Sequence, residues 1–572
     1  MYGFLITRCI PLQEASLDKP DILSYENVYF YYSPLPKFEN DHLFYEDEEK
    51  IVLLDGVVFN NHELMKSRKC CSWRETMDQM IQENPRTFQK ELRGSFCGAL
   101  LKKGSAEIMI FTNQSGEKTI YYTQQNTLFI AASHNNILTP ILKSQGFPLE
   151  PDFQAHKELL CTAEILHGKT PFQGIHRLTA GKYLLEKEES CEELRYHMFR
   201  NIPELDLTLE ECVEELDKRF RKAVDRIFSK NKEYGYQGEC DLSGGLDSRM
   251  ATWVAHDLGY RNILNVCYCQ SGNIDHTTSQ KIAHDLGNEY FFLPMDGGEL
   301  LMDTDEVVDK FGGQVTFFVC TGANRAMREI AAHNIGLCCT GLLGELHNAY
   351  WTEGTVHTPP NYIGYIGNLY SSVVPLQIPE KYTEGYDNFE HMNLYEYSVA
   401  LFLSSALVRQ QVCEVTSPFI DVDYLEFAYR IPLKWRKNYF LTMTWMTSKY
   451  PEAAKYVWQT KRMPVDKAYH QQFYFPKLLD DVRSLAVRCV NKAFSACHLL
   501  AQIALKSDMN PFEQWYCANP RLRQFLEDYY QKNIGRIADA QLQADVRKTY
   551  EQGRARDKLQ AVNLLAVYKR YF

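Results

Sequence analysis

The stretch from Asp241 to Met250 has the sequence "DLSGGLDSRM" and joins an apolar segment to an amphipathic one. Residues 239–242 can end a strand, and residues 249–258 have apolar side chains at helical spacing, with Gly259 as a C-terminal cap. A strand, a glycine turn and a helix start direct free backbone amides to one point, where the helix dipole favours negative charge. The stretch therefore predicts an anion site, and phosphate is the anion that we expect.

The side chains of this loop suit a phosphate that is bound together with a cation. Gly244 and Gly245 allow close approach of the backbone, and the hydroxyls of Ser243 and Ser248 can donate hydrogen bonds. Asp247 would repel a phosphate unless a cation lay between them, and magnesium is the natural choice. The alternative is a tight strand-to-helix turn in which Asp247 serves only as a cap.

The surrounding sequence predicts an α/β fold with a parallel sheet. From about Leu207 short apolar runs such as "NILNVCYC" alternate with long helical patterns, which is typical of strands joined by crossover helices. Ligands of such sheets bind at the carboxyl ends of the strands. After about Ser398 the pattern is almost wholly helical to Phe572, and loops between Gln314 and Phe402 are expected to line a substrate pocket.

The first 190 residues have a different pattern of apolar and polar residues. Short apolar runs punctuated by Gly, Asn, Asp and Lys predict antiparallel sheets, interrupted by helices near Trp73–Glu83 and Asp152–Leu159. The charged stretch from Leu185 to Leu194 is predicted to be a linker. Because 572 residues exceed one ordinary core, we expect two domains, at residues 1–190 and 207–572.

The composition excludes several classes of protein. A net charge of −11 argues against nucleic acid as a partner, and no segment approaches the roughly 20 apolar residues of a membrane span. The start of the sequence has no pattern of a signal peptide. The 17 cysteines are scattered without zinc-site spacing, so we expect a reduced, cytoplasmic protein. The oligomeric state is left open.

The glycine loop resembles the pyrophosphate loop of ATP-pyrophosphatases, which cleave ATP to AMP and pyrophosphate while they adenylate a substrate. The order of the following elements resembles asparagine synthetases, in which a similar aspartate, here Asp275, starts the second helix. The resemblance implies ATP and Mg²⁺ as cofactors. It implies nucleotide binding by Ser243, Gly244, Gly245, Leu246, Asp247 and Ser248.

Three later segments resemble the same family. "LCCTGLLGELHNAY", residues 337–350, is similar to a strand and loop whose acid holds magnesium, which implies that role for Glu345 beside Asp247. Its alternative is a solvent-facing acid. Residues 415–436 resemble a segment that closes the synthetase site, where Pro418, Phe419 and Asp421 match and can serve packing and capping.

The third segment, "WQTKRMPVD", resembles the one that carries the family's catalytic lysine. Lys461 matches best and Arg462 is its rival. A lysine near the α-phosphate can stabilise charge as pyrophosphate leaves. The alternative for Lys461 is an ordinary surface lysine.

The first half resembles the family's glutaminase domain, which implies an Ntn-hydrolase-like αββα sandwich. "MYGFLI" matches the usual start "MCGI", so Tyr2 stands where the nucleophilic cysteine belongs. A phenol with an ordinary pKa of about 10 is a poor substitute, and Cys9 is a remote alternative. The resemblance therefore implies a glutaminase-like domain without glutaminase activity.

We expect an ATP-dependent, AMP- and pyrophosphate-forming amide ligase of the asparagine synthetase type. It would adenylate a small-molecule, peptide or sugar carboxylate for attack by an amine or by ammonia, as in the related β-lactam synthetases and lasso-peptide cyclases. Asparagine synthesis with free ammonia or a partner glutaminase is the first alternative. A non-catalytic scaffold is the second, although the complete loop from Ser243 to Ser248 argues against it.

Overall fold

The computed structural model describes residues 1–8, 11, 16–125, 128–187, 190–348, 359–360, 371–497, 499–505 and 507–572, with the backbone alone at residues 397, 400, 401, 403–405 and 495. The alternative nucleophile Cys9, the last two residues of the 337–350 segment and parts of the expected substrate loops lie outside the described residues. No helix within the described ranges is long and apolar enough to cross a membrane.

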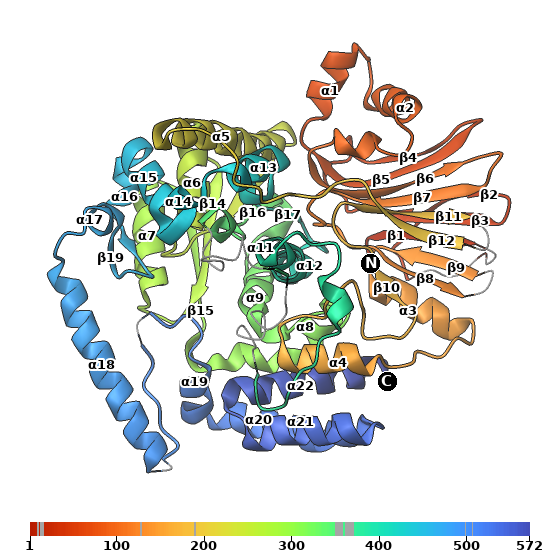
Figure 1. Cartoon of the computed structure of the whole chain (residues 1–572). Helices are drawn as coiled ribbons and strands as arrows, with labels where there is room; N and C mark the ends of the chain where they lie inside the picture. Colours follow the sequence, from red (N-terminus) through yellow and green to blue (C-terminus); the bar gives the residue numbers. More distant parts are fainter. Residues whose placement is uncertain are drawn as a thin grey trace.

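Two antiparallel sheets of six strands form the first half of the molecule (Figure 1). In spatial order, the first sheet contains β10 (His176–Arg177), β8 (Tyr121–Gln125), β9 (Leu128–Ala132), β1 (Gly3–Arg8), β3 (Val28–Ser33) and β2 (Asp21–Tyr25). The second contains β12 (Ser190–Arg195), β11 (Lys182–Lys187), β7 (Glu107–Thr112), β6 (Gly94–Lys102), β5 (Lys50–Val58) and β4 (Leu43–Glu46).

Helices cover the outer faces of both sheets, so the apolar runs of the strands are buried on both sides. On β1, Phe4 and Ile6 lie in the core between the sheets, whereas Leu5 faces the helical layer. The covering helices are α1 (Asn61–Arg68) and α2 (Trp73–Glu83) on the second sheet, and α3 (Asn135–Ser144) and α4 (Phe153–Cys161) on the first. The expected αββα layering and both expected helices are confirmed.

The expected linker is wrong. Residues 185–194 lie mostly in β11 and β12, which pair as a hairpin with Leu185 opposite Glu192. This hairpin forms the edge of the second sheet, and only β11 pairs with β7. Because β12 is an edge strand whose side chains are exposed or half-buried, it can be rich in acidic residues and still belong to the sheet. The sheet therefore extends to Arg195, five residues past the expected boundary.

A parallel sheet of five strands forms the centre of the second half, which confirms the α/β prediction. Its order is β15 (Glu289–Pro294), β14 (Ile263–Cys269), β13 (Gln237–Asp241), β16 (Ile335–Cys339) and β17 (Glu414–Thr416). The fifth strand was not expected, because it is three residues long within a region of helical pattern.

Helices cover both faces of this sheet (Figure 1). One face packs against α5 (Leu209–Glu233) and α6 (Asp247–Asp257), and the other against α9 (Thr321–Glu329) and α12 (Val399–Arg409). The remaining elements are α7 (Ile274–Leu286), α8 (Thr304–Lys310), α11 (Phe389–Asn393), α13 (Val422–Arg430), α14 (Leu433–Arg436), α15 (Phe440–Lys449), α16 (Pro451–Ala454), β18 (Val457–Trp458), β19 (Met463–Pro464), α17 (Val465–Tyr469), α18 (Phe475–Ala496), α19 (Phe512–Ala518), α20 (Pro520–Asn533), α21 (Ala540–Gln552) and α22 (Ala555–Tyr571).

Apolar packing joins the two halves. Helix α22 lies against α4 and α8, and one hydrophobic cluster includes Leu159 of α4 together with Leu564 of α22. Tyr568 of α22 also bonds through its hydroxyl to Nδ1 of His156, at 3.0 Å. The last helix of the chain therefore completes the core beneath the first sheet.

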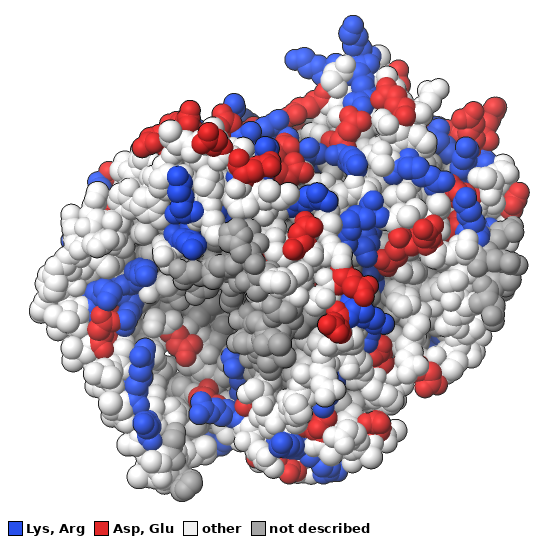
Figure 2. Space-filling model, viewed as in Figure 1, with Lys and Arg blue, Asp and Glu red and all other residues white. Residues whose placement is uncertain are grey.

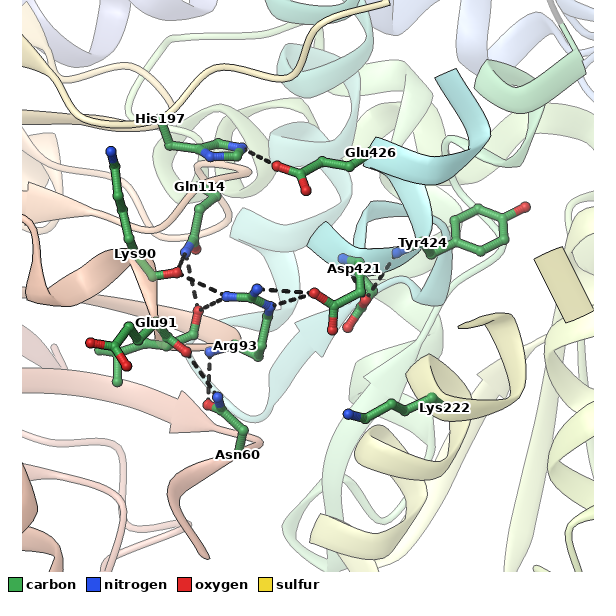
Figure 3. Close-up of polar contacts among 12 residues, drawn as sticks. Asn60, Lys90, Glu91, Arg93, Gln114, His197, Lys222, Asp421, Tyr424 and Glu426 are labelled. Atoms are coloured by element: carbon green, nitrogen blue, oxygen red, sulfur yellow. Dashed lines mark hydrogen bonds and ion pairs between the residues drawn. The ribbon is translucent and has the colours of Figure 1, made fainter. Parts of the chain in front are cut away.

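Polar contacts also join the halves, and two of them differ clearly in burial. Lys118 lies after β7, and its ammonium group donates to Glu414 of β17 at 2.7 Å and pairs with Asp55 of β5 at 3.4 Å. Burial lowers the pKa of Lys118, but the two carboxylates outweigh burial and raise it above its ordinary value. Nearer the surface, Arg93 donates to Asp423 of α13 at 2.9 Å. Figure 3 shows Arg93 facing the segment that includes Asp421 and Tyr424.

Candidate functional site

A cavity of about 360 Å³ opens at the carboxyl ends of β13 and β16. Strands β14 and β16 flank β13 on opposite sides, so the chain connections diverge at this point, which is where open α/β sheets bind ligands. The glycine loop and Glu345 line one side of the cavity, while Tyr268, Val319 and Met509 line the apolar part.

The glycine loop has the expected backbone but fewer free amides than the sequence predicts. The Ser243 amide donates to the Ser248 hydroxyl at 3.0 Å, and the Gly245 amide donates to the Ser243 hydroxyl at 3.1 Å. The Gly244 amide donates to Oδ1 of Asp275 at 2.9 Å. Side chains of the loop and of α7 thus fix the conformation of the loop backbone. Leu246 precedes α6 without a capping side chain, which leaves the first turn of this helix to face the cavity.

Asp247 begins α6 and lines the cavity. Its Oδ1 atom is buried and accepts no hydrogen bond within the described part of the chain. Burial, and after it the charge of Glu345, raises the pKa of Asp247 to about 8. A capping carboxylate accepts from amides two or three residues further along the helix, whereas the backbone hydrogen bond to the Asp247 carboxylate comes from its own amide. This geometry favours ligand binding over the capping alternative.

Two glycines allow the loop after β16 to reach the start of α6. A Cβ atom on Gly344 would lie 2.3 Å from Cγ of Asp247, and one on Gly341 would lie 2.3 Å from the Ser248 amide nitrogen. Between them Leu343 has a φ of +67°, in the left-handed region. These close approaches carry Glu345 to the wall of the cavity beside Asp247.

Arg436 stabilises the loop that carries Glu345 through the residues that follow it. Its side chain is fully buried, donates to the carbonyl oxygens of Leu346 and His347 at 3.0 and 3.2 Å, and forms an ion pair with Glu390 at 2.6 Å. The sequence places Arg436 at the end of the 415–436 segment without a role. In the same segment Asp421 caps α13, and Pro418 and Phe419 are buried, as expected for packing and capping.

Arg249 joins the glycine loop to the segment before Lys461. It is fully buried and donates to the carbonyl oxygens of Gly244 at 3.1 Å, Ala453 at 3.2 Å and Val457 at 2.6 Å. Burial lowers the pKa of this guanidinium to about 9. The Gly244 carbonyl also accepts from the amide of Gln459 at 3.0 Å, so the loop and β18 form one unit.

Lys461 lies in the turn between β18 and β19 and is exposed. Its Nζ atom lies 5.9 Å from the centroid of the Trp458 ring, and Lys461 is not among the residues that line the cavity. Arg462 forms an ion pair with Asp481 of α18 and donates to Ser484 at 3.0 Å. The structure thus brings Ser243, Gly245, Asp247, Ser248 and Glu345 together at the cavity. Gly244 and Leu246 belong to the same loop but do not line the cavity, because Leu246 packs into the core, and Lys461 lies to the side.

A second buried ion pair borders the cavity. Arg409 of α12 is fully buried and donates through both terminal nitrogens to Asp241, the last residue of β13, at 2.8 and 2.9 Å. No local sequence pattern predicts this pair, because its members lie 168 residues apart. Asp275 could be anticipated at the start of α7, but its bond to Gly244 could not.

The residues present fit a magnesium ion bound with phosphate. Asp247 and Glu345 supply two carboxylates, and the buried Oδ1 of Asp247 accepts no described hydrogen bond. Within the described residues no group of three or more His, Cys, Asp or Glu side chains is arranged to hold a metal alone. Mg²⁺ commonly binds through one or two carboxylates plus substrate phosphates, which matches this donor set.

The position expected for a glutaminase nucleophile lies at another, smaller cavity of about 40 Å³. Tyr2 lines it together with Asp55, Lys118 and Gln410, and its described lining includes no cysteine. Cys97 lies near Asp55 but is fully buried, and burial raises the pKa of its thiol. This cavity therefore offers no described thiolate.

Comparison with known proteins defines the class of the first half. Residues 38–197 match a model of the glutamine amidotransferase domain. Amidase chyE of Penicillium rubens is 25% identical over 177 residues, which cover 30% of this chain and 25% of the amidase. The chain thus spans about a quarter of the length of the curated relative that it matches.

Two solved structures are also similar at 10% identity, each over 51% of this chain and 74% of that chain. They are the allosteric regulatory enzyme of purine biosynthesis and glutamine phosphoribosylpyrophosphate amidotransferase from B. subtilis, with TM-scores of 0.23 and 0.22. These scores are too low to support an argument. The domain match concerns residues 38–197 alone, and the resemblance of the second half to asparagine synthetases stays a prediction.

Proposed function

We propose that this protein is an ATP-dependent amide ligase of the asparagine synthetase type that releases AMP and pyrophosphate. One observation supports the proposal above all others. Asp247, whose buried Oδ1 accepts no hydrogen bond from the described residues, lies beside Glu345 at the end of a glycine loop, in a cavity at the divergence point of a parallel sheet. Two adjacent carboxylates beside the open first turn of a helix suit a magnesium-bound polyphosphate better than either ligand alone.

In the proposed reaction, a carboxylate oxygen of the substrate bonds to the α-phosphorus of ATP while the bond to the pyrophosphate oxygen breaks. An amine nitrogen then attacks the activated carbonyl, loses a proton and displaces AMP. The first turn of α6 and the Ser243 and Ser248 hydroxyls would bind pyrophosphate, and Asp247 and Glu345 would hold Mg²⁺. When bound, the metal neutralises the charge that develops on the leaving pyrophosphate. Lys461 would stabilise charge at the α-phosphate.

The first half would not supply ammonia from glutamine. Its small cavity has Tyr2 and Lys118 in its wall and no described thiol. We infer that the amine comes from the substrate or from solution, with a small molecule, a peptide or a sugar as the carboxylate substrate. All described cysteines are free thiols, which supports a reducing compartment such as the cytoplasm.

The experiment is pyrophosphate release from ATP with a panel of carboxylates, with and without amines. We expect release by the wild type and a loss of at least about 100-fold in Asp247→Ala. Asp257→Ala is the matched control, because Asp257 ends the same helix and pairs with Arg221 far from the cavity. This control should retain the wild-type rate.

The other outcomes identify the alternatives. Release that requires aspartate and ammonia identifies asparagine synthesis. Neither release nor ATP binding, with any carboxylate, makes the chain a scaffold and refutes the ligase. Glutamine hydrolysis by the wild type would contradict the inactive first half.

A further inference from the structure

Helix α18 (Phe475–Ala496) presents its apolar side to solvent. In Figure 1 it lies at the edge of the molecule, beyond the hairpin that carries Lys461. Its apolar side chains recur at helical spacing and form one stripe along the helix. The large exposed members of this stripe are Phe475 (57%), Leu478 (47%), Leu479 (55%), Val482 (62%), Leu485 (62%) and Val490 (38%).

The opposite side of α18 faces the rest of the chain through polar contacts. Asp481 pairs with Arg462 and with Lys477, and Ser484 accepts a hydrogen bond from Arg462 at 3.0 Å. Asn491 exchanges two hydrogen bonds of 2.9 Å with the backbone of Ile503. These contacts fix the rotation of the helix, so its apolar stripe is held outward.

This exposure is the reverse of the usual arrangement, in which an amphipathic helix buries its apolar side. Contiguous apolar surface on this scale marks an interaction site. Exposed apolar residues continue beyond both ends of the helix, at Phe473 (75%) and Leu499 (55%). The stripe therefore requires an occupant.

The charges around the stripe indicate what that occupant is. Arg483, Arg488 and Lys492 are exposed, and no described carboxylate forms an ion pair with any of them. Residues 461–505 contain seven Lys or Arg against three Asp or Glu, in a chain whose net charge is −11. Figure 2 shows basic residues among uncharged ones over the part of the surface where α18 lies. A negative surface is the complement of this region.

We propose that α18 binds the surface of an anionic lipid bilayer, lying in the plane of the interface. An apolar stripe that contains Phe and Leu, with basic residues beside it, matches helices that bury one side at the headgroup boundary. Phe475, Val482 and Leu485 enter the acyl boundary, while the exposed Arg483 and Lys492, which flank the stripe at helical spacing, contact anionic headgroups. The chain is thereby a peripheral membrane protein, a property independent of the proposed ligase reaction.

The test is sedimentation of the full chain with vesicles. Vesicles of phosphatidylcholine that contain phosphatidylserine should bind the chain, and vesicles of phosphatidylcholine alone should bind it far more weakly. The double variant Val482→Glu/Leu485→Glu should reduce binding to the anionic vesicles at least about 30-fold. Ile202→Glu changes an apolar residue of similar exposure (45%) in another part of the chain and should bind like the wild type.

The double variant Arg483→Gln/Lys492→Gln tests the charge separately. Two cations near an anionic surface account for about 30-fold in affinity, so this loss should appear at low salt and shrink as salt is added. Circular dichroism melting of each variant shows whether it remains folded. We expect all variants to fold, because the changed residues are exposed.

Three results would overturn the proposal. They are equal binding to neutral and anionic vesicles, no binding by the wild type, and undiminished binding by Val482→Glu/Leu485→Glu. A wild-type dimer in solution that this variant dissociates, together with no vesicle binding, would assign the stripe to a second copy of the chain instead.

Discussion

At the scale of single residues, protonation of Asp247 makes the stability of the folded protein depend on pH. Its pKa of about 8 lies above the ordinary carboxyl value, so the folded state binds a proton that the unfolded state releases between about pH 4 and 8. Without metal, the free energy of unfolding should therefore fall as pH rises through this window. The upper limit of this fall is about 1.4 kcal/mol per pH unit.

Asp247→Asn should remove this dependence. Urea denaturation at pH 5, 7 and 9 with a chelator should show the wild type losing stability relative to the variant as pH rises. Mg²⁺ added together with ATP should restore stability to the wild type at pH 9 and should stabilise the variant far less. Parallel curves for the two proteins under all conditions would contradict the assignment.

Lys461 allows a second prediction at this scale. Lys461 is exposed, and its proposed catalytic role is based on the sequence of its segment. A variant that removes its charge tests whether Lys461 is catalytic or an ordinary surface lysine. Lys461→Met should lower the rate of pyrophosphate release at least about 100-fold, with little change in stability. Lys455→Met is the matched control, because Lys455 pairs only with the nearby Glu452 on the surface. Equal rates for both variants would make Lys461 a surface residue.

At the scale of elements, the site depends on the contact between the loop after β16 and the first turn of α6. Gly344→Ala places a Cβ atom 2.3 Å from Cγ of Asp247, so Asp247 or the loop must shift. We expect pyrophosphate release to fall by about 100-fold or more, because a shift of about 1 Å at a catalytic group has this effect. Magnesium-dependent stabilisation should be lost in parallel.

Gly535→Ala provides the control for that prediction. Nothing lies within 4 Å of its added Cβ atom, and Gly535 is not among the glycines of positive φ. Thermal unfolding and the release assay should both match the wild type. Full activity in Gly344→Ala would show that the loop is not held as closely as its geometry indicates.

The sequence predicted those elements whose signals are local. The strand, glycine turn and helix around Asp247, and helix α2 after its cap Ser72, follow from patterns within about ten residues. The linker failed because acidic residues suit an exposed edge strand as well as a loop. Strand β17 was missed because three residues carry no periodicity, and they become a strand only through pairing with β16.

The same limit applies to the site. The loop residues and Glu345 could be named from motifs, and the structure brings them together. The loop amides, however, have partners such as Asp275 that a motif does not show. Arg249 and Arg436 act through carbonyl groups far along the chain, so only the folded structure reveals them.

At the scale of the whole molecule, the buried contact of Lys118 with Asp55 and Glu414 ties the two halves together. Lys118→Met leaves two buried carboxylates without a cation and should lower the free energy of unfolding by about 3–5 kcal/mol. The double variant Lys118→Met/Glu414→Gln should recover part of this loss. Urea denaturation measures both variants.

Arg93→Met serves as the comparison, because the pair of Arg93 with Asp423 is partly exposed (Figure 3). Its effect should be about 1 kcal/mol or less. If Lys118→Met and Arg93→Met lowered the free energy of unfolding equally, the prediction that the buried contact of Lys118 contributes more than the partly exposed contact of Arg93 would be wrong.

The packing of α22 against α4 has a consequence for the synthesis of the protein. Roughly 400 residues separate the two helices, so at about 5–20 residues per second the ribosome makes α22 some 20–80 s after α4. Throughout translation of the second half, the apolar side of α4 that packs against α22, which includes Leu159, lacks this partner. A nascent chain in this condition is a substrate for chaperones, and premature termination before α22 would release a product prone to aggregate.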